Sequence, residues 1–459
     1  MVDVAVILGA LAALIALAYR GVSLLLLAPA LAVLSVAITG DGPIFATYTQ
    51  VFMRAMGGFV IQYFPLFLLG AVFGKLMAAS GSAAALAQAI IARLGTRRAV
   101  LAVILSCAVM TYGGVSLFVV AFAVYPIAAA LFRAGDLPKV LIPGAIALGA
   151  FTFTMTALPG TPAIQNAIPM PYFGTTPFAA PGLGLIAGAV MLLGGWLWLE
   201  YRLRRLGPGY GTFDDAEAGL PQTALPSLGV AGLPLVMVIV LNLVFTFAVI
   251  PGMDTGYLAQ SEYGDTDIGQ LRGIWSIIAA LCLSSLGLIA LNAGRLWDTL
   301  AATLEDGAQD ALMPMFNTAS LVGFGAVIAA LEAFGLIRDW VVGFGGDNPL
   351  IGLALSTSLL AGITGSASGG MSIALATLGP AYLDMAQAVG IDPALLHRVT
   401  AVATGGLDAL PHNGAVITLL TICGLSHREA YGDIAVVAVV IPVAALVVLV
   451  ALGTVFGSF

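Results

Sequence analysis

Long apolar runs follow one another along the whole chain, with only short polar segments between them. A membrane-spanning helix needs about 20 consecutive apolar residues. Single spans are expected near 2–18, 22–38, 57–79, 138–172, 182–200, 228–250, 271–291, 310–334, 394–424 and 431–456, with 138–172 and 394–424 each interrupted. Two further stretches, 98–133 and 349–386, are about twice a span long and have a small polar centre, which is typical of re-entrant hairpins. The pattern predicts an all-α polytopic membrane protein.

The composition agrees with this pattern and excludes other classes. Of the 459 residues, 60 % are hydrophobic and only 8 % are charged, whereas a soluble domain carries about a quarter. The first run begins with Asp3 and ends at Tyr19-Arg20, so we interpret it as a membrane helix and not as a cleaved signal. The net charge is −7, and the basic cluster around Arg202 is too small to favour a nucleic-acid partner.

The distribution of basic residues predicts the orientation. Cytoplasmic loops of membrane proteins are enriched in lysine and arginine. With 202–205 placed in the cytoplasm and both hairpins re-entrant, twelve of the 16 basic residues fall inside. Those outside are Arg54, Arg272, Arg338 and Arg398. We therefore expect a multi-pass protein of the bacterial inner membrane with both termini in the periplasm.

An internal repeat organises the chain. Residues 157–166 are ALPGTPAIQN and residues 409–418 are ALPHNGAVIT, an offset of 252. At the same offset, 112–116 corresponds to 364–368. An odd number of crossings between the copies makes them antiparallel, the inverted-repeat arrangement of secondary transporters. We expect a first repeat at 1–200, a cytoplasmic linker at 201–227 and a second repeat at 228–459.

Each repeat contains a helix broken by residues that cannot continue it. The breakers are Pro159, Gly160 and Pro162 in the first copy and Pro411, Asn413 and Gly414 in the second. The helix following the first break is expected to start near Thr161, where free N–H groups bind anions. Ser116 and Ser368, at the two hairpin tips, are each expected to cap a returning helix. We expect no lysine or arginine near either break, which favours a ligand with one carboxylate and a hydroxyl or keto group.

The second break also carries titratable groups. Asp408 and His412 are four residues apart, so on a helix they would share one face. Ionisable groups at membrane depth are functional by default, and this pair is a candidate for proton coupling. Sodium is the alternative, held by oxygen atoms near Ser116, Ser366, Ser368 and Asn413. No cofactor other than the coupling cation is expected.

Parts of the same pattern are compatible with functions other than cation-coupled transport. The Asp408–His412 pair also permits sodium/proton exchange. A serine hydrolase using Ser366 or Ser368 with His412 is disfavoured because the first copy has Gly160 where the second has His412, so we expect no enzyme. The structural alternative is that the small residues only allow close helix packing.

Residues 110–181, 362–375 (GITGSASGGMSIAL) and 409–420 (ALPHNGAVITLL) resemble the gluconate permease (GntP) family of bacterial carboxylate:proton symporters. The resemblance implies membership of the ion-transporter superfamily, with scaffold and transport domains, an elevator mechanism and a homodimer in membrane lipid. It places the substrate between the hairpin tips and the broken helices. The implied contact residues are Gly113, Gly114, Ser116, Gly160, Thr161, Asn166, Ser366, Ser368, His412 and Asn413.

The first break departs from the sugar-acid branch of that family. That branch has a His-Pro-rich break where this chain has Ala-Leu-Pro-Gly-Thr-Pro at 157–162. The chain looks more like the branch linked to short hydroxy or keto acids, such as 3-hydroxybutyrate.

Overall fold

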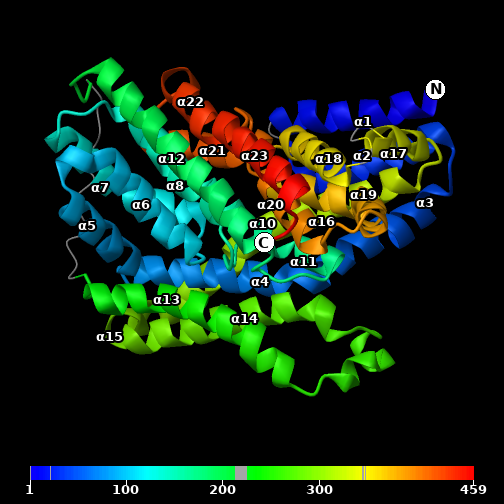
Figure 1. Ribbon diagram of the computed structural model, residues 1–459, viewed down its shortest axis with the longest axis horizontal. Helices are drawn as coiled ribbons and strands as arrows, with labels where there is room; N and C mark the ends of the chain where they lie inside the picture. Colours follow the sequence, from blue (N-terminus) through cyan, green and yellow to red (C-terminus); the bar gives the residue numbers. More distant parts are fainter. Residues whose placement is uncertain (1, 21, 212–224, 344–345, 347) are drawn as a thin grey trace.

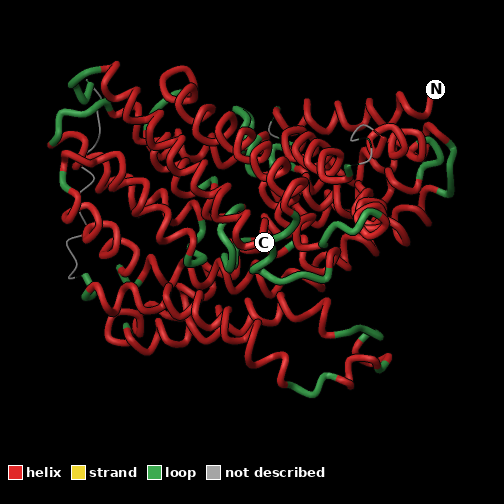
Figure 2. The backbone as a smooth tube through the Cα atoms, in the orientation of Figure 1, coloured by secondary structure: helices red, strands yellow, loops and turns green. Residues whose placement is uncertain are grey.

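The computed structural model describes residues 2–20, 22–211, 225–343, 346 and 348–459. These residues form helices joined by turns and loops, with no strand among them (Figure 2). Within the described part of the chain, eight helices are long and apolar enough to cross a membrane, or nine if the bent pair 82–94 and 96–112 counts as one span. The prediction of an all-α polytopic protein is confirmed.

One group of eight helices contains the two longest, α4 and α16, which pack against each other (Figure 1). Its members are α1 (Val2–Tyr19), α2 (Leu24–Thr39), α3 (Ile44–Ala46), α4 (Met53–Ala79), α13 (Leu228–Val244), α14 (Ile268–Leu291), α15 (Ala293–Leu296) and α16 (Leu300–Ala330). Helix α4 packs along α16, because glycines on α16 let the backbones approach. A Cβ atom at Gly307 would lie 2.8 Å from Val72 Cα, and one at Gly323 would lie 2.9 Å from the Phe52 carbonyl oxygen.

The remaining helices follow the same order in each half of the chain. In the first half they are α5 (Ser82–Leu94), α6 (Ala99–Tyr112), α7 (Leu117–Ala134), α8 (Ile142–Ala150), α9 (Phe153–Thr156), α10 (Ile164–Ala167), α11 (Pro169–Phe173) and α12 (Pro181–Leu206). In the second they are α17 (Phe334–Gly343), α18 (Pro349–Thr364), α19 (Ala367–Ala388), α20 (Pro393–Thr404), α21 (Gly414–Cys423), α22 (His427–Ala435) and α23 (Ile441–Phe456). Both halves thus contain a short helix, a hairpin, a broken helix and a long final helix.

Two pairs of neighbouring helices occupy the stretches expected to form hairpins, and their re-entrant course stays a prediction. Helices α6 and α7 pack together as the first, and α18 and α19 as the second. Glycines make the tips, since Gly114 has φ +95° and Gly365 has φ +59°, a backbone conformation that other residues rarely adopt. Antiparallel orientation of the halves stays a prediction. Helix α12 extends to Leu206, inside the predicted linker, and residues 212–224 of that linker lie outside the described residues.

Candidate functional site

The first break is longer than the sequence suggested. Helix α9 ends at Thr156, and α10 begins only at Ile164, three residues after the predicted start. Pro162 has no N–H to donate, and Thr161 Oγ1 accepts a 3.3 Å hydrogen bond from the N–H of Ala163, which holds this segment outside the helix. Helical dihedrals continue through Ile168 into α11, which ends at Phe173, and the anion site at this half-helix N-terminus stays a prediction.

The second break begins earlier than its proline. Helix α20 ends at Thr404, and Gly405-Gly406 lead into a short turn at 407–409 before α21 starts. Asn413 caps α21, since its Oδ1 accepts hydrogen bonds from the N–H groups of Ala415 (2.6 Å) and Val416 (3.1 Å). At the offset of 252, Asn413 corresponds to Thr161, and each accepts from the N–H two residues ahead. The same local hydrogen bond therefore recurs in both copies, but it caps a helix only in the second, because the N-cap of α10 is Ala163.

The expectation that Asp408 and His412 share a helical face is wrong. Residues 410–413 are not helical, because Pro411 cannot donate to a helical turn here. His412 Nε2 lies 3.1 Å from the carbonyl oxygen of Gly362 in the second hairpin. Asp408 lines the cavity described next. The break thus directs the two side chains to different surroundings.

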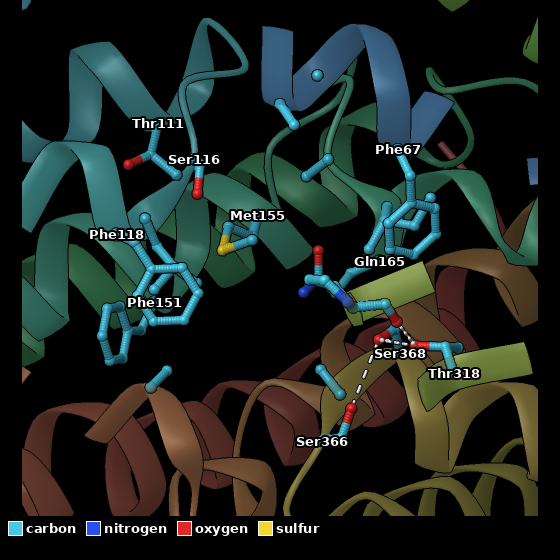
Figure 3. Close-up of a pocket in the computed structure, with 18 of the residues that line it drawn as sticks. Phe67, Thr111, Ser116, Phe118, Phe151, Met155, Gln165, Thr318, Ser366 and Ser368 are labelled. Atoms are coloured by element: carbon cyan, nitrogen blue, oxygen red, sulfur yellow. Dashed lines mark hydrogen bonds between the residues drawn. The ribbon is translucent and has the colours of Figure 1, made fainter. Parts of the chain in front are cut away.

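A cavity of about 690 Å³ lies between the two hairpin tips, the two breaks and helices α4 and α16 (Figure 3). Of the predicted site residues, those that line it are Gly114, Ser116, Ser366, Ser368, Asp408 and Asn413. Those that do not are Gly113, Gly160, Thr161, Asn166 and His412. Gly113 instead packs against Leu235, and a Cβ atom at Gly160 would lie 2.6 Å from the Phe178 ring. These two glycines serve the close packing behind the wall.

The hairpin serines act differently from the prediction. Ser116 occupies the N-cap position of α7 without a side-chain capping bond. In the second hairpin Ser366 is the cap, because its Oγ accepts a 3.1 Å bond from the N–H of Gly369. Ser368 lies in the first turn of α19, where its Oγ is 3.3 Å from Thr318 Oγ1 of α16 and 3.5 Å from Ser366 Oγ (Figure 3). The predicted N-cap position is correct for Ser116, although its side chain makes no capping bond, and it is wrong for Ser368.

Five polar residues of the cavity wall were missed from the sequence; two are Asp310 and Thr318, and the other three share one feature. These three are Thr111, Gln165 and Asn317. Each has a buried side-chain oxygen without a hydrogen-bond partner among the described residues, as does Asp408. Figure 3 shows Gln165 between Met155 and the Ser368–Thr318 pair. A signal existed for two of them, since Gln165 belongs to the repeated motif and Asn317 interrupts an apolar stretch.

A buried arginine lies directly behind the first break, contrary to the prediction that none is near. The Arg398 side chain is fully buried within the protein. Its guanidinium donates to the carbonyl oxygens of Thr156 (3.1 Å), Pro177 (3.4 Å) and Ala179 (2.8 Å) and to Oδ1 of Asn166 (3.1 Å). The sequence missed this because Arg398 comes from the other half of the chain.

The amide of Asn166 is the centre of this network. Its Nδ2 donates to the carbonyl oxygens of Thr161 (3.0 Å) and Pro177 (2.9 Å). Because Arg398 can only donate, the amide oxygen must face it, and His397 Nε2, at 3.1 Å from that oxygen, then also donates. His397 Nδ1 is left to accept from the hydroxyl of Thr175 at 2.6 Å. Asn166 is therefore fully bonded within the protein, which makes it part of the frame of the site.

The chain has a close relative of known sequence. It is 44 % identical over 448 residues to a protein of Bacillus subtilis (strain 168) called "Uncharacterized transporter YxjC", which covers 94 % of this chain and 95 % of that one. The chain belongs to the same transporter family as YxjC. No family model matches the sequence.

The fold is also that of a transporter. The solved structure of the YdaH transporter of Alcanivorax borkumensis matches with a TM-score of 0.55 over 90 % of each chain. At 16 % identity this likeness shows a shared fold alone. Together with the apolar spans, the two comparisons establish an integral membrane transporter.

Proposed function

We propose that this protein is a secondary active transporter that couples uptake of a small monocarboxylate to a cation, with the proton as the coupling ion. The observation that carries the proposal is one cavity lined by hydroxyl groups, with the Asp408 carboxyl in its wall and the Arg398 guanidinium behind it. A volume of about 690 Å³ lies within the range of about 300–1,000 Å³ that small-molecule sites occupy.

Asp408 is the coupling group in this proposal. Its Oδ1 atom is buried without a hydrogen-bond partner among the described residues, and a negative charge buried without a counter-ion is costly. Binding a proton neutralises it, and an anionic substrate nearby favours that proton. His412 supports the same break through its contact with Gly362 and need not exchange protons itself.

The substrate class follows from the cavity wall and from the resemblance to gluconate permeases. Hydroxyl and amide groups of Ser116, Gln165, Asn317, Thr318 and Ser368 surround the space. Such groups bind the carboxylate and hydroxyl oxygens of a small acid by hydrogen bonds. Candidates are 3-hydroxybutyrate, a related hydroxy or keto acid, and gluconate.

Sodium coupling is the second candidate. The hydroxyl oxygen of Ser368 lies 3.3 Å from that of Thr318 and 3.5 Å from that of Ser366, along one side of the cavity, and oxygen ligands suit hard cations. Of the other oxygens first considered for this ion, Asn413 Oδ1 already accepts two backbone hydrogen bonds. A sodium/proton exchanger would use the same groups without an organic substrate.

The cellular setting is part of the proposal. We place the protein in the bacterial inner membrane with both termini periplasmic, as a homodimer surrounded by lipid. The helices packed with α4 and α16 (α1–α4 and α13–α16) are then the scaffold. The two hairpins and their broken helices are the transport domain that moves across the membrane.

Uptake into proteoliposomes tests the proposal. Vesicles containing the purified protein should accumulate labelled 3-hydroxybutyrate or gluconate when a proton or sodium gradient is imposed separately. Accumulation driven by the proton gradient alone supports proton coupling, and accumulation driven by sodium alone supports the second candidate. Equal uptake without either gradient contradicts coupling. A pH change on adding sodium without any organic acid identifies an exchanger.

A further inference from the structure

Arg398 carries a charge that its hydrogen bonds do not balance. All five N–H groups of the guanidinium are used: Nε and Nη2 both donate to the Ala179 carbonyl oxygen (3.0 and 2.8 Å), and Nη2 also donates to that of Pro177. Nη1 donates to the Thr156 carbonyl oxygen and to Asn166 Oδ1. Every one of these acceptors is uncharged. The network satisfies the donors and leaves the positive charge in the interior.

A buried guanidinium bonded only to uncharged acceptors costs more free energy than is needed to hold two segments together. Burying a charge without a counter-ion is expensive, and ionisable groups at membrane depth are typically functional. A glutamine at position 398 would supply two N–H donors without that cost. We therefore expect an anion to lie close to Arg398 in at least one state of the transport cycle.

Two acidic residues line the neighbouring cavity, and their surroundings differ. Asp310 forms a 2.9 Å ion pair with Lys75, and its side chain is 57 % exposed. Asp408 has a buried carboxyl oxygen without a hydrogen-bond partner among the described residues. Thr156 lines the same cavity, and its carbonyl oxygen accepts from Arg398, so the guanidinium lies immediately behind the wall.

We propose that Arg398 is the fixed internal cation of the transport cycle, balancing Asp408 in the empty protein and the substrate carboxylate in the loaded one. This rests on the proposed function. In the empty state the interior holds one positive charge on Arg398 and one negative charge on Asp408. When a monocarboxylate enters, one proton binds Asp408, and the substrate becomes the only anion beside Arg398. The interior charge is zero in both states, and one proton accompanies each monocarboxylate.

Arg398 is a positioning residue in this proposal and does not touch the substrate. Its donors are occupied by the break and by the loop before α12, so its charge acts across the Thr156 carbonyl. Charge and hydrogen bonding can therefore be separated by substitution. Arg398→Lys keeps the charge and loses part of the hydrogen bonding, whereas Arg398→Gln keeps part of the hydrogen bonding and loses the charge.

The first experiment measures stabilisation of purified full-length protein by 3-hydroxybutyrate across a concentration series. The apparent dissociation constant should stay within about threefold of wild type in Arg398→Lys and rise about tenfold or more in Arg398→Gln. Adding Asp408→Asn to Arg398→Gln should recover little of the loss, because the substrate carboxylate still has no cation beside it. Arg202→Gln is the matched control, because Arg202 pairs with Asp433 and neither residue lines the cavity. Equal losses in the lysine and glutamine variants overturn the proposal.

A second measurement needs no substrate and guards against variants that fold poorly. Thermal unfolding of Arg398→Gln should occur at a lower temperature than in wild type, and Asp408→Asn in that background should raise it again. Asp310→Asn should not, since Asp310 has Lys75 as its partner. If wild type binds no carboxylate, the proposed function fails, while rescue by Asp408→Asn still supports the charge pairing and its absence contradicts it.

Discussion

Nη1 of Arg398 donates a 3.1 Å hydrogen bond to Oδ1 of Asn166, which lies 232 residues earlier in the chain. This bond joins α20 of the second half to the helix that follows the first break. The same amide donates to the Thr161 and Pro177 carbonyl oxygens and accepts from His397. One buried side chain thus fixes the position of one break relative to the other half of the protein.

Asn166→Ala should destabilise the protein strongly. It leaves the Thr161 carbonyl oxygen, one Arg398 N–H and the His397 ring without this partner, while the Pro177 carbonyl oxygen keeps its bond from Arg398. Each unsatisfied buried group costs about 1–3 kcal/mol. We expect a total of about 3 kcal/mol or more, measured by unfolding in detergent. Gln165→Ala is the control, because its amide oxygen has no hydrogen-bond partner among the described residues. Equal unfolding temperatures of the two variants would contradict the framework role of Asn166.

The sequence predicted the elements of this site because their signals are local. Proline and glycine within apolar stretches mark the two breaks, and the small polar centres mark the two hairpins. The boundaries were less accurate, since Gly405-Gly406 already ends α20 before Pro411 is reached. Capping by Ser366 in place of Ser368 is an error of the same kind, decided by backbone geometry at the tip.

The contacts between the two halves of the chain could not be predicted from the sequence. Nothing in the order of residues indicates that Arg398 reaches the carbonyl oxygen of Thr156, 242 positions away. Asn166 was predicted as a substrate contact for the same reason, because the sequence does not show which groups its amide bonds. All of these partners belong to the protein itself. Sequence patterns locate polar residues near a cavity, whereas only packing decides which of them face it.

Asn413 should matter more for stability than for substrate contact. Its Oδ1 caps α21, and its Nδ2 donates to the carbonyl oxygens of Gly365 (2.9 Å) and Asp408 (2.8 Å). Asn413→Asp keeps the cap and loses the two donors, whereas Asn413→Ala loses both. Loss of a cap costs about 0.5–2 kcal/mol, so we expect the alanine variant to unfold at a lower temperature than the aspartate variant. The reverse order would show that a carboxylate facing the carbonyl oxygens of Gly365 and Asp408 costs more than the cap contributes.

Gln165→Leu should impair transport without harming the fold. The side chain lines the cavity, and its buried oxygen has no hydrogen-bond partner among the described residues. Loss of one hydrogen bond to a ligand weakens binding by about 0.5–1.5 kcal/mol, roughly a threefold to tenfold rise in the apparent KM. Initial uptake rates at varied 3-hydroxybutyrate concentration measure this, and unfolding temperature is the control. An unchanged KM would place Gln165 outside the substrate contacts.

The hydroxyl contact between Thr318 and Ser368 should show energetic coupling. It joins α16 to the second hairpin at 3.3 Å. Thr318→Val and Ser368→Ala each remove one partner, so their combined effect on unfolding free energy should be smaller than the sum, by about 0.5–1.5 kcal/mol. Full additivity would show that the contact contributes nothing. Ser372→Ala is a suitable control, because its hydroxyl bonds only within its own helix.

Asp408→Asn should uncouple transport while leaving the substrate site in place. The amide resembles the protonated carboxyl in shape and charge, so the variant stays in the state that accepts an anion, without binding or releasing a proton. Exchange of labelled for unlabelled 3-hydroxybutyrate across proteoliposomes should persist, and accumulation driven by a proton gradient should be lost. His412→Ala is the informative neighbour, since His412 contacts the second hairpin at Gly362 and does not line the cavity. We expect it to slow uptake and to keep the response to the gradient. Loss of gradient-driven accumulation in His412→Ala with its retention in Asp408→Asn would transfer the coupling role from the carboxyl to the imidazole.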